Sequence, residues 1–296
     1  MRRARPARAA RYLCEAAAVA TLLAFFRMLP LDWASALGAC IGGLLGPALP
    51  VHRRGLENIA RALPELSDAE VRACARRMWR HLGRTAAEYP HLRRFSIERP
   101  DGRVELVGRD NLEEARRSPT GGIFVTGHVG NWELTVLPAE QTGIPLATVY
   151  RAANNPIVDR MIQRLRSGVG QLYLPKGASG AREMVRALAA GKHLLLLVDQ
   201  KLNTGIPVPF FGRDAMTPPA VAALALKYDC PLWPLRVERL KGATFRVTVL
   251  PKLAIPKAGT REERIRAIMV AINATLEGWI RERPEQWLWL HRRWPD

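Results

Sequence analysis

Short apolar runs alternate with helical patterns along most of the chain after Gly102. Runs that predict strands cover residues 123–126, 146–150, 194–198, 232–240 and 245–250. Apolar residues recur at helical spacing in residues 155–166, 178–189, 218–228 and 261–281. Because strands and helices in alternation are typical of βαβ units, we expect an α/β fold in which helices flank a mostly parallel central sheet.

Residues 67–83 predict a further helix with two different faces. Ser67 and Glu70 have the spacing of a capping box, and apolar side chains follow at helical spacing. The other face carries a row of arginines spaced by four: Arg72, Arg76, Arg80 and Arg84. Such a row is either solvated or binds phosphates of lipid head groups or an acidic carrier protein, and the sequence favours neither interpretation.

A long apolar stretch near the beginning of the chain is a candidate for a membrane anchor. Residues 16–51 contain only two charged side chains, Arg27 and Asp32. The uncharged part, residues 33–51, is about long enough to cross a bilayer, but its glycines and prolines disfavour a straight helix. A cleaved signal peptide is the alternative, which the charges in and beside the apolar region disfavour. A spanning helix and an interfacial hairpin both stay open.

Composition adds a strong positive charge to this picture. Lys and Arg number 45 against 27 Asp and Glu, a net charge of +18, which favours contact with nucleic acid or anionic lipid. An apolar content of 48% excludes a disordered chain. The four cysteines are scattered without metal-ligand spacing, so we expect no metal and no disulfide framework. We divide the chain into a basic membrane anchor, residues 1–52, and one globular domain, residues 53–296.

His128 is the residue to which reactivity is most easily assigned. It follows the predicted strand at 123–126, at the carboxyl end, where ligands bind in open α/β sheets. Flanking glycines leave room for a substrate, and an imidazole can take a proton from a hydroxyl near neutral pH. Glu133 can orient this imidazole because His128 precedes the next helix. Asp199, which follows the strand at 194–198, should lie at the same edge of the sheet.

The segment 127–133, Gly-His-Val-Gly-Asn-Trp-Glu, resembles the His-x4-acid signature of the lipid A biosynthesis acyltransferase family, the lauroyl and myristoyl transferases of bacterial outer-membrane lipid. The resemblance extends to 150–151, 154–156, 159, 166, 199–200, 209–212 and 284–294. It implies that residues 53–296 form an acyltransferase domain that needs no cofactor. The implied reaction moves a fatty acyl chain from acyl carrier protein to a hydroxyl of a lipid A precursor, at the cytoplasmic face of the inner membrane.

The same resemblance implies roles for individual residues. The expected catalytic residues are His128, Glu133, Arg166 and Asp199. The expected substrate-binding residues are Gly130, Asn131, Trp132 and Arg151. Either Glu133 or Asp199 orients the imidazole, and either Arg166 or backbone amides stabilise the oxyanion.

Tryptophans and arginines near the end of the chain bear on the choice of partner. Trp279, Trp287, Trp289 and Trp294 lie among arginines, a mixture suited to stacking on bases or to the head-group level of a membrane. The apolar beginning of the chain favours lipid. The expected partners are therefore acyl carrier protein, an anionic glycolipid acceptor and the inner membrane, and not nucleic acid. Another glycolipid or a lysophospholipid stays open as the acceptor, because the motif identifies the reaction better than the substrate.

Overall fold

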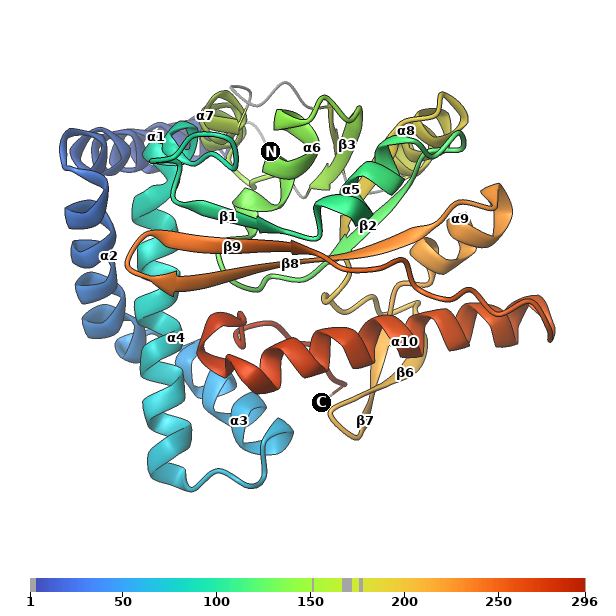
Figure 1. The fold of residues 1–296 in the computed structure, drawn as a ribbon. Coiled ribbons are helices and arrows are strands. Elements are labelled where there is room, and N and C mark those ends of the chain that lie inside the picture. Colours follow the sequence, from blue (N-terminus) through green and yellow to red (C-terminus); the bar gives the residue numbers. More distant parts are fainter. Residues whose placement is uncertain (1–3, 151, 167–171, 176–177, 296) are drawn as a thin grey trace.

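The computed structural model describes residues 4–150, 152–166, 172–175 and 178–295. The strands of its central sheet are β1 (Val104–Val107), β2 (Gly122–Thr126), β3 (Leu146–Tyr150), β4 (Leu172–Pro175), β5 (His193–Leu197), β8 (Leu232–Lys241) and β9 (Thr244–Val249). They lie in the order β1-β9-β8-β2-β5-β3-β4 (Figure 1). Neighbouring strands run parallel, except that β8 and β9 form an antiparallel pair. The expected mostly parallel sheet is therefore confirmed.

Helices surround this sheet. They are α1 (Ala4–Met28), α2 (Leu31–Leu45), α3 (His52–Ala62), α4 (Asp68–Glu88), α5 (Arg109–Arg116), α6 (Leu137–Gln141), α7 (Pro156–Arg166), α8 (Ala178–Ala189), α9 (Ala220–Tyr228) and α10 (Arg261–Glu282). Short 3-10 helices are η1 (Gly46–Ala48), η2 (Tyr89–Arg94), η3 (Trp132–Val136) and η5 (Pro284–Gln286). The predicted capping box is confirmed, since Ser67 and Glu70 bond each other reciprocally at the start of α4.

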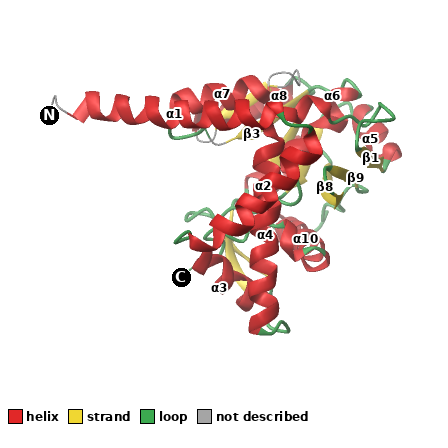
Figure 2. Ribbon diagram, turned by 90° about the vertical axis from the view of Figure 1, so that its left-hand side faces the viewer, coloured by secondary structure: helices red, strands yellow, loops and turns green. Residues whose placement is uncertain are grey.

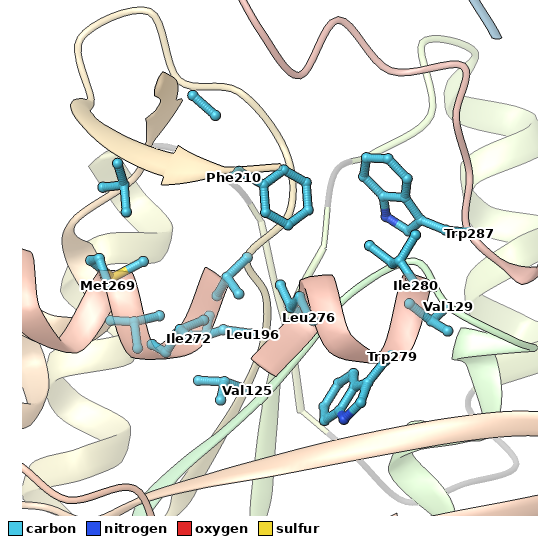
Figure 3. Close-up of a cluster of buried hydrophobic side chains, with 14 of the residues drawn as sticks. Val125, Val129, Leu196, Phe210, Met269, Ile272, Leu276, Trp279, Ile280 and Trp287 are labelled. Atoms are coloured by element: carbon cyan, nitrogen blue, oxygen red, sulfur yellow. The ribbon is translucent and has the colours of Figure 1, made fainter. Parts of the chain in front are cut away.

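Alternation along the strands builds a hydrophobic core on each face of the sheet. In β2, Ile123 and Val125 pack on one side and Phe124 packs on the other. Helix α10 covers the first face and buries Ile272 and Leu276 against it (Figure 3). A separate hairpin of β6 (Ile206–Phe210) and β7 (Arg213–Thr217) joins this side. The strand ends are thereby held rigidly around the edge at which His128 was expected.

The apolar stretch at residues 16–51 holds the second half of α1, all of α2 and η1, so its uncharged part at 33–51 forms no single straight helix, as its glycines and prolines indicated. Whether it spans a membrane or lies at the interface stays open. Helix α1 ends at Met28, and Pro30 precedes α2, because proline cannot extend the preceding helix. Among the described residues, Arg8–Met28 is a helix long and apolar enough to cross a membrane, and Leu31–Ala48 with His52–Ala62 passes the same test only as a pair. The later piece, Leu31–Ala48, is bent by 91° from the helix that follows it. The division of the chain at residue 52 stays a prediction.

Candidate active site

The sheet brings His128 and Asp199 opposite each other. Strands β2 and β5 are parallel neighbours in a register that pairs Thr126 with Leu197. His128 lies two residues beyond Thr126, and Asp199 lies two residues beyond Leu197. The pairing continues past the strands, since the Val198 N–H donates to the Thr126 carbonyl at 2.9 Å. Equal offsets from paired strand ends place the two side chains face to face, as the sequence analysis expected.

Asp199 holds the imidazole of His128 in one orientation. Its Oδ1 lies 2.8 Å from Nδ1 of His128. Its Oδ2 accepts hydrogen bonds from the His128 backbone N–H at 2.7 Å and from Nε1 of Trp287 at 2.8 Å. Burial alone would raise the pKa of Asp199, but the adjacent His128 ring and these hydrogen bonds lower it. The charged carboxylate therefore accepts a hydrogen from Nδ1, which leaves the lone pair of His128 on Nε2.

Glu133 pairs with Arg166. The guanidinium of Arg166 donates from Nε to Oε2 at 2.7 Å and from Nη2 to Oε1 at 2.5 Å, and the hydroxyl of Tyr89 donates to the same carboxylate. Burial works against the charge of Arg166, but Glu133 raises its pKa above the usual value, so the guanidinium stays charged. Burial, followed by the charge of Glu133, raises the pKa of the nearby Tyr173 to about 12. Of the two candidate acids, Asp199 contacts the imidazole.

A cavity of about 210 Å³ brings these two clusters together. His128, Glu133 and Arg166 all line it. The ring of Trp132, which was expected to bind substrate, lines it as well and lies 5.3 Å from the His128 ring between centroids. Apolar side chains of β3 and β5 complete much of the wall. The cavity therefore offers a base, a fixed cation and an apolar surface to one ligand.

The turn after His128 depends on a glycine and a buried amide. Gly130 has φ +60°, and a Cβ at this position would lie 2.2 Å from the carbonyl oxygen of Val237. Asn131 is fully buried, donates to Glu88 at 2.9 Å and accepts from the Glu133 backbone N–H at 3.3 Å. These contacts support the loop that carries His128. A role of Gly130 and Asn131 in substrate binding stays a prediction.

Three residues beside the site were not predicted from the sequence. Trp287 donates to Asp199, the His291 ring lies 5.0 Å from the His128 ring between centroids, and Nε2 of Gln200 lies 3.5 Å from Nε2 of His128. Two of them belong to the segment 284–294 that carried the resemblance, but nothing in its pattern places it against β2. The expected ligand Arg151 lies outside the described residues.

The tryptophans near the end of the chain belong to the core. Their exposed fractions are 6% for Trp279, 1% for Trp287, 0% for Trp289 and 4% for Trp294. Three indole N–H groups are bonded inside the fold: Trp287 donates to Asp199, Trp289 donates to the Pro284 carbonyl at 2.7 Å, and Trp294 donates to the Phe210 carbonyl at 3.1 Å. The expectation that these rings stack on bases or contact lipid head groups is wrong, because all four lie in the core, where Trp287 packs on both Trp289 and Trp294.

Comparison with known proteins identifies the family of the chain. The sequence model of the bacterial lipid A biosynthesis acyltransferases matches residues 2–296. The chain belongs to this family. It is 25% identical over 244 residues to the lipid A biosynthesis myristoyltransferase of Escherichia coli K12, covering 81% of this chain and 73% of the relative. It is 27% identical over 256 residues to the lauroyltransferase of that strain, covering 82% and 77%, and 27% identical over 270 residues to its palmitoleoyltransferase, covering 87% and 83%.

Membership in the family makes the chain an acyltransferase of lipid A biosynthesis. The relatives carry three different acyl names at similar identity, so the family assignment does not extend to one acyl chain. The site just described lies within the matched residues, and it contains the His-x4-acid segment on which the resemblance was based.

Proposed function

We propose that the chain transfers a fatty acyl group from acyl carrier protein to a hydroxyl of a lipid A precursor, with His128 as the general base. The observation that carries this proposal is the bond from Nδ1 of His128, which lines the cavity, to the buried, charged carboxylate of Asp199 behind it. This bond leaves Nε2 to accept a proton. The net charge of +18 supports both an acidic carrier and a phosphorylated acceptor.

In the proposed reaction His128 takes the proton of the acceptor hydroxyl while the hydroxyl oxygen bonds to the thioester carbonyl carbon. The carbon–sulfur bond then breaks, and the imidazolium returns the proton to the departing thiolate. An ester and a free thiol result, so the reaction needs no further reactant. Asp199 stabilises the imidazolium between these two steps, as the acid does in hydrolytic triads.

Arg166 supplies the second part of the proposed chemistry. Its guanidinium is charged, lines the cavity and is held in a fixed plane by Glu133. A positioned cation of this kind suits the oxyanion of the tetrahedral intermediate or a phosphate of the acceptor. Glu133 is then a positioning residue, since its carboxylate is occupied by Arg166 and Tyr89.

We place the reaction at the cytoplasmic face of the inner membrane. The apolar helix Arg8–Met28 supports membrane attachment, because little of it is buried in the fold. A carrier-bound acyl donor would be met on the cytoplasmic side.

The proposal is tested by mass spectrometry of a lipid A precursor after incubation with several acyl carrier proteins and the purified enzyme. We expect one added acyl chain with wild-type enzyme and none above background with His128→Ala. His52→Ala is the matched control, because it removes a half-buried imidazole on α3 that bonds Trp79. The base assignment fails if folded His128→Ala keeps more than about a tenth of the wild-type rate, given the usual size of general-base catalysis.

A further inference from the structure

Helix α2 and η1 carry an exposed apolar stripe that begins just after Asp32, an exposed carboxylate paired with Arg103. Its outward positions are Trp33, Ala36, Leu37, Cys40, Ile41, Leu44, Leu45, Ala48 and Leu49. Trp33 is 72% exposed and Leu44 is 75% exposed, in a protein that buries most of its other large apolar side chains. At 1.5 Å per residue the stripe is about 24 Å long. Monomeric soluble proteins rarely expose a continuous apolar surface of this length.

The opposite face of α2 is fixed to the body of the protein. A Cβ at Gly38 would lie 2.4 Å from the Gly83 carbonyl oxygen, and a Cβ at Gly42 would lie 2.3 Å from the Trp79 carbonyl oxygen. At these positions the backbones of α2 and α4 pack directly against each other, which small residues such as glycine allow. The fold therefore uses one side of α2 for packing on α4 and leaves the apolar side outward, at the side of the molecule that faces the viewer in Figure 2.

Arginines of α4 border this stripe. The side chain of Arg80 lies over Gly43, and Arg84 donates to Ser35 at 2.9 Å. Arg76 lies near the end of the stripe, where its charge contributes, after burial, to lowering the pKa of His52. In the described part of the chain neither Arg76 nor Arg80 has a carboxylate within 4.0 Å. Several exposed arginines elsewhere have one, as in the pairs Arg53–Glu57, Arg109–Glu98, Arg116–Glu113 and Arg246–Glu105.

We propose that α2 lies in the plane of an anionic lipid surface, with its apolar stripe among the acyl chains and the α4 arginines at the head groups. An amphipathic helix beside basic side chains has the composition of an interfacial membrane contact. Further exposed apolar side chains, Phe25 and Met28, lie near the end of α1, shortly before Trp33 in the chain. This contact is separate from the acyl-transfer chemistry, but it rests on the proposed membrane location.

Charge favours a bilayer over the other occupants. A second copy of the chain would bring the same unpaired arginines together around an apolar seam, and like charges repel. An acidic protein would match the arginines but not a charge-free stripe about 24 Å long. Anionic lipids match both parts at once.

Native cysteines allow the proposal to be tested on the full chain. Cys40 lies on the stripe and Cys14 lies on α1, and both are exposed, whereas Cys74 and Cys230 are buried. A solvent-sensitive thiol probe is placed on Cys40 in a Cys14→Ser variant, and on Cys14 in a Cys40→Ser variant. Each labelled protein is reconstituted with vesicles of phosphatidylglycerol and phosphatidylethanolamine that contain nitroxide lipids of known depth.

We expect the emission of the Cys40 probe to shift to the blue and to be quenched more strongly by shallow than by deep nitroxides. Cys40 lies near the middle of the stripe, so a spanning α2 would give the reverse order and overturn the proposal. A Cys40 probe that stays aqueous while the Cys14 probe enters lipid also overturns it. If both probes stay aqueous, the membrane location itself fails. A blue-shifted probe that no nitroxide quenches would show that another protein copy covers the stripe.

The arginines are tested with Arg76→Gln plus Arg80→Gln on the Cys40-labelled protein. We expect the equilibrium constant for lipid contact at Cys40 to fall about 25-fold, about fivefold for each arginine near an anionic surface. The matched control is Arg182→Gln plus Arg261→Gln, which makes the same change in charge on α8 and α10, away from α2 (Figure 1). An equal effect of the two pairs would show that net charge alone is responsible.

Discussion

Asp199→Asn should abolish the basicity of His128 while leaving the fold intact. Two donors, the His128 backbone N–H and Nε1 of Trp287, point at Oδ2 of Asp199 at 2.7 and 2.8 Å. An asparagine amide must therefore place its oxygen at the Oδ2 position and its NH2 group at the Oδ1 position. That NH2 donates to Nδ1 of His128, so the ring hydrogen moves to Nε2. An imidazole with hydrogen on Nε2 cannot accept the proton of the acceptor hydroxyl there.

The size of the effect follows from this exchange of tautomers. In Ser-His-Asp hydrolases the equivalent change costs about 10⁴ in kcat with the geometry preserved. Here the contact between Asp199 and the imidazole is 2.8 Å long, and the Asp199 side chain is fully buried. Water therefore cannot reach the substituted amide and restore the original tautomer. We expect kcat to fall about 10³- to 10⁴-fold, with little change in KM for the acyl carrier.

The tautomer argument is tested by measuring steady-state turnover and thermal unfolding of three enzymes: wild type, Asp199→Asn and Asp199→Ala. Alanine leaves the imidazole free to adopt either tautomer, so Asp199→Asn should be no faster than Asp199→Ala although it conserves size. The tautomer argument is refuted if Asp199→Asn is clearly faster than Asp199→Ala, or if it retains near-wild-type turnover.

Three further predictions concern neighbouring groups. Trp287→Phe removes a donor to the Asp199 carboxylate and should lower kcat about thirtyfold, or about 2 kcal/mol, which lies within the 1.5–3 kcal/mol of a charged hydrogen bond. Trp289→Phe, equally buried but bonded to a backbone carbonyl, should leave kcat unchanged in the same kinetic assay. Glu133→Gln leaves Arg166 without its charged partner and should lower the free energy of unfolding by about 3 kcal/mol in a denaturant titration. Burial lowers the pKa of His81 from 6.5 to about 3, so its contribution to stability is complete above pH 6.5 and declines toward pH 3. His81→Gln should therefore flatten the pH dependence of unfolding in this range, by up to about 1.4 kcal/mol per pH unit.

Strands buried on both faces were predictable from the sequence, and marginal strands were not. Strand β3 was predicted with its observed bounds, because four of its five residues are apolar or aromatic and the fifth, Thr148, is β-branched and favours a strand. The four-residue strand β1 has two exposed side chains, and β6 contains two prolines, so neither shows a continuous apolar run. The partner of β1 is β9, far away in the sequence, so tertiary contacts rather than local pattern make β1 a strand. Strand β6 pairs with the neighbouring β7, but its prolines hide the strand pattern.

Part of the site was likewise predictable. His128 and Asp199 follow apolar runs directly, so their place at one edge could be argued from parallel topology alone. The ion pair between Glu133 and Arg166 could not be predicted from the sequence, because it depends on how α7 lies relative to the cavity. The hydrogen bond from Trp287 to Asp199 could not be predicted either. It depends on an isolated β-bridge between Val129 and Trp287, which joins the loop after β2 to the end of the chain. No periodicity in the sequence indicates such a contact.

One buried ion pair joins the membrane-facing helix to the loop that carries the base. Glu88 is fully buried and accepts two bonds from Arg239 at 2.5 and 2.9 Å, one from Ser35 of α2 at 2.7 Å and one from Asn131 at 2.9 Å. Removing one partner of a buried pair costs about 3–5 kcal/mol, so separating these elements is strongly unfavourable. Helix α2 and the loop after β2 therefore belong to one rigid frame. Asn131, which the motif match assigned to substrate binding, contacts this frame through its amide, and that contact favours a positioning role: it fixes the catalytic loop relative to the helix that we place at the lipid surface.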